Sequence, residues 1–162
     1  MEPTVVEKNA LLLVGMVSRA EMQDIGALWE TFTERESLIQ QVIPGVWYEL
    51  HEYPKGHTWG DPFFLMVGVG VTRLEAMAET LFGKVLAPCH YAVFTHRLGD
   101  AGFAGANEPI EDWLTSSSYE RSRDYDLQVF DDRFKGPEDA ESVLEFWIPV
   151  RLKSGAERQP GG

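Results

Sequence analysis

The order of predicted elements occurs twice in this chain of 162 residues. Each half gives an apolar strand, an amphipathic helix and two further strands. Glu49 and Gln128 hold matching places on the third element and lie 79 residues apart, and Val71 and Val150, which close the fourth elements, also lie 79 residues apart. Two separate landmarks with one offset indicate a duplicated unit. Such units bury their apolar faces together, and their junction is a common place for a ligand cleft.

The first half is predicted from apolar spacing. A short apolar run at residues 11–17 indicates a central strand. A helix from about residue 21 to 39 is predicted because apolar side chains recur three or four positions apart, at Ile25, Leu28, Trp29 and Phe32. A hairpin follows, with strands at residues 46–53 and 63–71 around a loop rich in glycine and proline.

The second half repeats this order. Its expected elements are a strand at residues 90–96, a helix from about Pro109, and strands at residues 125–130 and 143–152. The connection between the halves, residues 72–88, is expected to hold a short helix around residues 74–81.

The predicted fold class is therefore α+β. Two pseudo-symmetric strand-helix-strand-strand modules, about residues 4–72 and 88–153, are expected to form a mainly antiparallel, curved sheet with a central cleft. Residues 1–153 are taken as one domain, and the polar, glycine-rich residues 154–162 as a flexible tail.

The net charge of −12 argues against direct nucleic-acid binding, which needs a concentrated basic face. It also disfavours an anionic membrane as a partner, whereas a cationic ligand is permitted. Cys89 is the only cysteine, so an internal disulfide is excluded. Without a predicted leader or an apolar run of membrane-spanning length, the chain is expected to be cytoplasmic.

Neither a cofactor nor a metal is predicted. The segment Gly68-Val69-Gly70 lacks the third glycine and the following helix of a dinucleotide fingerprint. It is better explained by close approach of a ligand or a neighbouring backbone. His90 and His96 are too far apart along one strand to chelate a metal unaided.

Several short motifs, in this order, resemble the gyrase-inhibitor-like family, which includes the effector-binding domains of AraC-type and MerR-type transcription regulators. The motifs of the first half are Val14-Gly15, Leu28-Trp29-Glu30 and residues 67–71. Those of the second half are residues 91–96, Trp113-Leu114, residues 127–131 and residues 147–150. The resemblance covers about residues 2–153.

The resemblance implies a duplicated fold whose centre binds small hydrophobic, often cationic, molecules, in regulators on behalf of an attached DNA-binding module. Since the resemblance accounts for nearly the whole chain, a stand-alone domain acting through a separate partner is expected. The family usually carries a Glu and a Tyr two residues apart on the penultimate strand, and Gln128 and Phe130 stand there in this chain. A neutral amide attracts a desolvated cation less than a carboxylate does.

Strand alternation suggests which side chains face the cleft. If Gln128 and Phe130 face it, then Glu49, Trp47 and His51 are expected to do so. On the last strand of each module the same logic selects Glu145 and Trp147 together with Met66 and Gly68. With the helical tryptophans added, the expected ligand-binding residues are Trp29, Trp47, Glu49, Met66, Trp113, Gln128, Phe130, Glu145 and Trp147. Core packing is an alternative for each aromatic residue, above all for the helical residues Trp29 and Trp113.

The function predicted from these residues is reversible binding of a small hydrophobic molecule, with or without a positive charge, in a regulatory role. No catalytic residue is assigned. Two alternatives stay open. One is a hydrolase of the same family, with Glu49 or Glu145 as general base. The other is an acidic inhibitor of a DNA-handling enzyme, suggested by the net charge.

Overall fold

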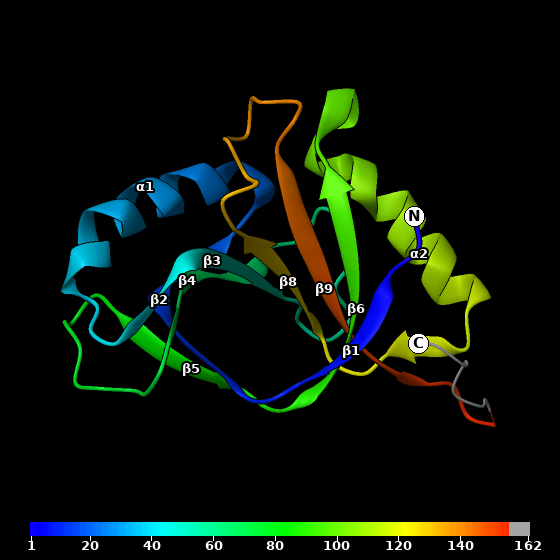
Figure 1. Cartoon of the computed structure of the whole chain (residues 1–162), viewed down its shortest axis with the longest axis horizontal. Helices are drawn as coiled ribbons and strands as arrows, with labels where there is room; N and C mark the ends of the chain where they lie inside the picture. The colour runs from blue at the N-terminus through cyan, green and yellow to red at the C-terminus, as the bar shows by residue number, and fades with distance from the viewer. Residues whose placement is uncertain (156–162) are drawn as a thin grey trace.

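One curled antiparallel sheet carries two helices on the same face (Figure 1). The computed structural model describes residues 1–155. The strands are β1 (Thr4–Lys8), β2 (Leu11–Ala20), β3 (Val42–Glu52), β4 (Phe63–Val71), β5 (Phe82–Leu86), β6 (Cys89–Arg97), β7 (Tyr119–Arg121), β8 (Tyr125–Phe130) and β9 (Val143–Leu152). The helices are α1 (Ile25–Arg35) and α2 (Asn107–Ser116), with short 3₁₀ turns beside them. The α+β prediction is confirmed.

The strand β1, which begins the first half of the chain, and the strand β5, which precedes the second half, each lie beside the other half. The sheet order is β1-β6-β9-β8-β3-β4-β2-β5, and β7 pairs with the end of β9. The N-terminal strand β1 therefore borders the second module, while β5, which follows the first hairpin, borders the first module. This arrangement ties the modules into one sheet at both edges as well as at the centre.

The duplication is visible in the strand register. Within the first hairpin Glu49 pairs with Val67, and within the second Gln128 pairs with Phe146. Both partners keep the 79-residue offset seen in the sequence. Across the centre of the sheet β3 pairs with β8, so that Glu49 lies directly opposite Gln128 and His51 opposite Asp126.

Two glycines allow β2 and β4 to approach closely. Gly15 and Gly68 are paired across these strands, and a Cβ atom on Gly15 would lie 1.9 Å from the carbonyl oxygen of Val67. Any side chain here would push the strands apart. The close approach expected at Gly68 is therefore made by backbone, not by a ligand.

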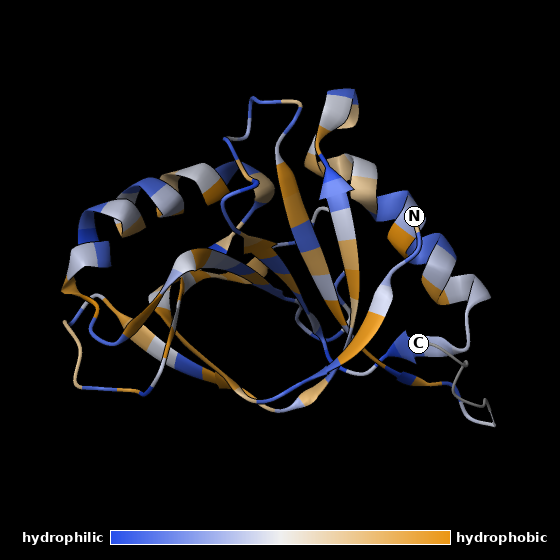
Figure 2. Cartoon of the chain, in the orientation of Figure 1, coloured by the Kyte–Doolittle hydropathy of each residue, from blue (hydrophilic) through white to orange (hydrophobic). Residues whose placement is uncertain are grey.

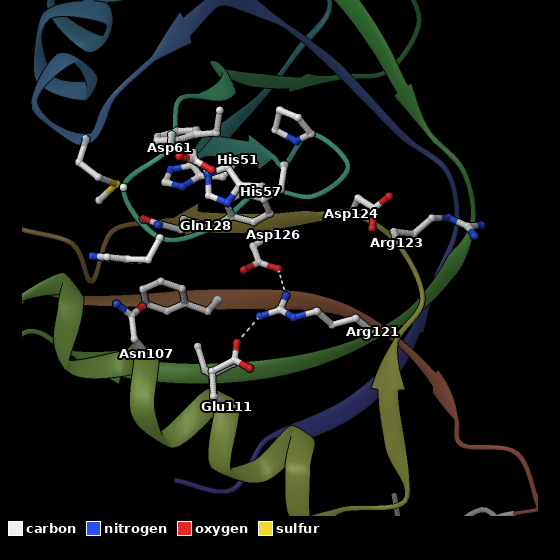
Figure 3. Close-up of a pocket in the computed structure, with 18 of the residues that line it drawn as sticks. His51, His57, Asp61, Asn107, Glu111, Arg121, Arg123, Asp124, Asp126 and Gln128 are labelled. Atoms are coloured by element: carbon white, nitrogen blue, oxygen red, sulfur yellow. Dashed lines mark hydrogen bonds and ion pairs between the residues drawn. The ribbon is translucent and has the colours of Figure 1, made fainter.

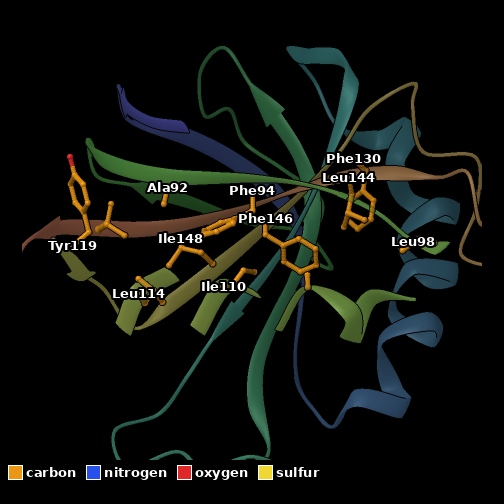
Figure 4. Close-up of a cluster of buried hydrophobic side chains, with 12 residues drawn as sticks. Ala92, Phe94, Leu98, Ile110, Leu114, Tyr119, Phe130, Leu144, Phe146 and Ile148 are labelled. Atoms are coloured by element: carbon orange, nitrogen blue, oxygen red, sulfur yellow. The ribbon is translucent and has the colours of Figure 1, made fainter. Parts of the chain in front are cut away.

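The strands are rich in hydrophobic residues (Figure 2), and their side chains form separate buried clusters on the two faces of the sheet. On the helical face, α2 covers a cluster that includes Phe94, Ile110, Phe146 and Ile148 (Figure 4). The corresponding cluster under α1 contains Phe32 and the side chains of β4 that alternate towards the helix. On the opposite, concave face, Leu50, Met66, Leu127 and Trp147 belong to a separate buried cluster.

The hairpin strands β4, β8 and β9 have the predicted bounds. The helix expected at residues 74–81 is wrong, because this segment forms no helix and leads into β5. Leu81 is buried there, and β5 provides hydrogen-bond partners for the edge of β2, so tertiary pairing overrides local helix preference. Most of the predicted tail, residues 156–162, lies outside the described residues. Within residues 1–155, neither helix has the length and apolar character needed to cross a membrane.

Candidate functional site

A cavity of about 860 Å³ lies on the helical face where the two modules meet (Figure 3). Its floor is formed by the centre of the sheet, with His51 from β3, Gln128 from β8 and Phe146 from β9. One wall comes from α2, and a second comes from the loop between β3 and β4. Both modules therefore contribute, and the volume is within the range of small-molecule sites.

The walls are largely apolar. Five large side chains from different elements line the cavity: Tyr53, Phe63, Phe103, Ile110 and Phe146. The polar side chains that accompany them include the amides of Asn107 and Gln128. The lining thus combines a large apolar surface with polar and charged groups, a combination that can hold and orient a small organic molecule.

Glu49 lies beside the cavity, on the same face of the sheet, in a closed network of hydrogen bonds. Its side chain is buried, and both carboxylate oxygens accept hydrogen bonds, one from Trp29 Nε1 at 2.7 Å and one from His51 Nε2 at 2.6 Å. The His51 ring also stacks on Phe63 with ring centres 4.8 Å apart. Glu49 therefore holds the floor residue His51 in place and is not itself among the residues that line the cavity.

A second charged network lies at the side of the cavity. The Arg121 guanidinium at the end of β7 donates to Asp126 on β8 and, over 2.6 Å, to Glu111 on α2 (Figure 3). Burial raises the pKa of the Asp126 carboxyl above its ordinary value, against the opposing effect of Arg121. Burial also opposes the charge on Arg121, but Asp126 and Glu111 raise the pKa of the guanidinium overall.

The loop between β3 and β4 is held by its own hydrogen bonds. The Asp61 carboxylate accepts from the backbone N–H and the hydroxyl of Thr58, and these bonds lower its pKa. Gly56 and Gly60 have positive φ angles of 79° and 93°, which suit the two tight turns. Trp59 stands on this loop at the cavity mouth with 80% of its surface exposed.

Of the nine predicted ligand-binding residues, Gln128 lines the cavity. Trp29, Trp47, Glu49 and Phe130 share its face of the sheet but are packed beside it. Trp29 contacts the rings of Phe32 and Phe130 edge to face, and Trp47 Nε1 donates to Glu36. Trp29, Trp47 and Phe130 are therefore packed in the core, which was the alternative interpretation of the aromatic residues.

Trp113 also belongs to the core. It stacks on Tyr119 and meets Phe94 edge to face, on the side of α2 that covers the second module. Trp113 is not among the residues that line the cavity.

The expectation that Met66, Glu145 and Trp147 share a face with Gln128 is wrong. Gln128 is paired with Phe146, so the neighbours of Phe146 on β9 point to the opposite face. Trp147 and Met66 are buried there in the concave cluster. Glu145 lies on the same face, where it accepts from Trp147 Nε1 at 3.1 Å and pairs with Arg133 at 3.3 Å.

Several charged residues of the site were not predicted from the sequence, among them Asp126 and Arg121. Asp126 is two positions from Gln128 on the same strand, so strand alternation alone could have placed it in the cleft. Arg121 gave no such signal, because it enters the cavity from the short strand β7. Among residues 1–155, no group of three or more His, Cys, Asp and Glu side chains is arranged to hold a metal ion.

The GyrI-like small molecule binding domain matches residues 1–151. The transcriptional regulator BrlR of Pseudomonas aeruginosa is 30% identical over 155 residues, which cover 93% of this chain and 56% of that protein. This chain thus spans little more than half the length of that relative.

Two solved structures have the same fold. The C-terminal domain of EcmrR gives a TM-score of 0.73 at 9% identity, with 94% of this chain and 98% of that chain covered. SAV2435 bound to tetraphenylphosphonium gives a TM-score of 0.69 at 18% identity, with coverage of 93% and 94%. With the family match over nearly the whole sequence, the chain belongs to the GyrI-like small-molecule-binding domain family.

Proposed function

We propose that this protein reversibly binds a small, flat, largely apolar organic molecule in the cavity between its two modules. The observation that carries the proposal is the cavity of about 860 Å³, built by both modules around Gln128 and walled by aromatic side chains. Burial of the ligand's apolar surface would drive binding, and the ring faces and amides would set its orientation.

We further propose that occupancy has a regulatory effect. Support comes from the similarity to a transcriptional regulator over most of this chain. A DNA-binding component, in a separate protein or in the same polypeptide, would read the occupied state. The cavity suits such a signal because it connects β3, β8 and α2, elements from both modules.

The alternatives receive less support from the geometry. The hydrolase alternative assigned a general base to Glu49 or Glu145, yet both oxygens of Glu49 are bonded internally and Glu145 lies on the other face of the sheet. The acidic-inhibitor alternative makes a separate prediction. It predicts that the protein inhibits a DNA-handling enzyme, and that this inhibition does not depend on the cavity.

The test is to fill the cavity. N-methylacridone, a neutral fluorescent three-ring molecule, serves as the probe. Gln128→Trp places a large side chain on the cavity floor and should weaken probe binding by about tenfold or more, since the ligand loses its space. Val17→Trp is the matched control, because Val17 is exposed on a separate groove formed by β2, β4 and β5. Equal affinity in wild type and Gln128→Trp would contradict the proposal.

A further inference from the structure

The charged end of the cavity already contains a cation from the protein itself. Arg121 reaches in from β7 and joins Glu111 and Asp126, which come from α2 and β8 (Figure 3). Its side chain is 34% exposed, so it is open to the cavity yet partly withdrawn from water. Two carboxylates that bind one guanidinium could equally bind the positive group of an organic ligand if the guanidinium were absent.

The other carboxylates at the cavity give a cation little to bind. Glu49, beside the cavity, is bonded to Trp29 and His51 through both of its oxygens. Asp61 is exposed at the mouth and accepts from Thr58, and Asp124 is exposed at the rim. Exposed charges are screened by water and salt, so they contribute little to selectivity. The charge that could select a cation is therefore mainly that of Asp126, whose side chain is 18% exposed, whereas Glu111 is 62% exposed and adds a weaker, screened charge.

The guanidinium also offers something to a neutral ligand. Arginine carries five N–H donors, and Glu111 and Asp126 each accept one of them. The remaining donors, with the amides of Asn107 and Gln128 in the same cavity, are suited to a carbonyl or another hydrogen-bond acceptor on the ligand.

We propose that Arg121 determines ligand charge in this protein: it occupies the cation position between Glu111 and Asp126, so the cavity selects uncharged molecules that carry a hydrogen-bond acceptor. This inference rests on the proposed function, since it concerns the same cavity. An organic cation could use the two carboxylates only by displacing Arg121, which would leave a guanidinium in need of new partners.

The experiment compares two fluorescent probes of nearly the same shape, the neutral N-methylacridone and the cationic N-methylacridinium. In wild type, N-methylacridone should bind at least about tenfold more tightly. In Arg121→Met, Glu111 and Asp126 are free to attract the cation, and the affinity ratio should move towards N-methylacridinium by about tenfold or more. Arg121→Lys should keep the preference of wild type.

Arg97→Met is the matched control. Arg97 has the same charge and also pairs with a carboxylate, that of Glu141, but it is not among the residues that line the cavity. Its removal should leave the affinity ratio unchanged. Since Arg121→Met leaves two carboxylates together, the double variant Arg121→Met with Glu111→Gln provides a second test in which only the sheltered carboxylate of Asp126 remains. It should also shift the ratio towards the cation.

The outcomes separate the two proposals. If N-methylacridone binding is lost in Gln128→Trp but the ratio is unchanged in both Arg121 variants, the cavity function stands and the role of Arg121 is wrong. A wild type that already prefers N-methylacridinium would also overturn the role of Arg121. If folded wild type and Arg121→Met bind neither probe, the proposed function and this inference both fail.

Discussion

Glu49 and Gln128 lie directly opposite each other on β3 and β8, at equivalent positions of the duplicated modules. Their environments differ. Glu49 is 5% exposed and bonded through both oxygens, whereas Gln128 is half-buried and faces the cavity. The two modules are thus similar in backbone but differ in the residue type and the hydrogen bonds at this central position. One copy of the position supports the floor, and the other is available to a ligand.

Glu49→Gln should reduce the free energy of unfolding by about 1–3 kcal/mol, because a carboxamide cannot accept from both Trp29 and His51 and turns its own N–H₂ towards a donor. Chemical denaturation measures this cost. The Glu36→Gln variant is a control, since Glu36 accepts from Trp47 alone among the described contacts, and it should lose about 1 kcal/mol or less. A change in the ratio of cation to neutral ligand affinity in Glu49→Gln would show that Glu49 acts on the ligand directly.

Trp147→Ala should destabilise the protein by about 3–5 kcal/mol, the usual cost of removing a large aromatic side chain from a core. Trp147 is 7% exposed and packs on the concave face with Tyr91, 5.5 Å between ring centres. Under conditions where the variant is folded, its affinity for N-methylacridone should match that of wild type. Selective loss of binding in a fully folded variant would place the ligand on the concave face.

The acid dependence of stability should differ in sign between two aspartates. The folded-state pKa of Asp126 is raised by burial, so its ionisation costs stability as pH rises above its unfolded value. The folded-state pKa of Asp131 is lowered, chiefly by hydrogen bonds from Arg133, so its contribution is present above the unfolded value and is lost as pH falls.

Denaturation of Asp126→Asn, Asp131→Asn and wild type between about pH 3 and pH 7 measures this difference. As pH rises, Asp126→Asn should gain stability relative to wild type, and Asp131→Asn should lose it. Parallel curves for the two variants would refute the assignment of these two environments.

Trp59 should report ligand binding. It is 80% exposed at the mouth of the cavity, so a ligand that stacks against it should quench or shift its emission. Trp59→Phe should lower this fluorescence response while changing the free energy of unfolding by no more than about 0.5 kcal/mol, as for other exposed positions. Trp113→Phe is the contrasting variant, since Trp113 is packed in the core, and it should keep the response. An undiminished response in Trp59→Phe would show that this loop stays away from the ligand.

The repeated offset in the sequence predicted that Glu49 and Gln128 hold matching places in the two halves, and the strand register agrees with this. The offset did not determine which residues of β4 and β9 face the cleft. Met66 and Glu145 are themselves 79 residues apart, so the prediction was consistent between the modules and displaced by one residue in both. A shift of one residue turns every side chain of a strand to the other face.

The long hairpin loops explain why this shift was not detected. Ten residues, 53–62, separate β3 from β4, and twelve, 131–142, separate β8 from β9. Loops of this length do not fix strand register in the way that a two-residue turn does. The walls of the cavity were equally hidden, because Arg121, Glu111 and Trp59 reach it from segments whose positions depend on tertiary packing.

A crystal structure of the protein with N-methylacridone bound tests the central claim most directly. The account predicts ligand density on the helical face of the sheet, in contact with Gln128 and Phe146 and covered at the mouth by the loop that carries Trp59, with the ligand carbonyl within hydrogen-bond distance of Arg121. Density on the concave face, between Met66 and Trp147, would contradict it.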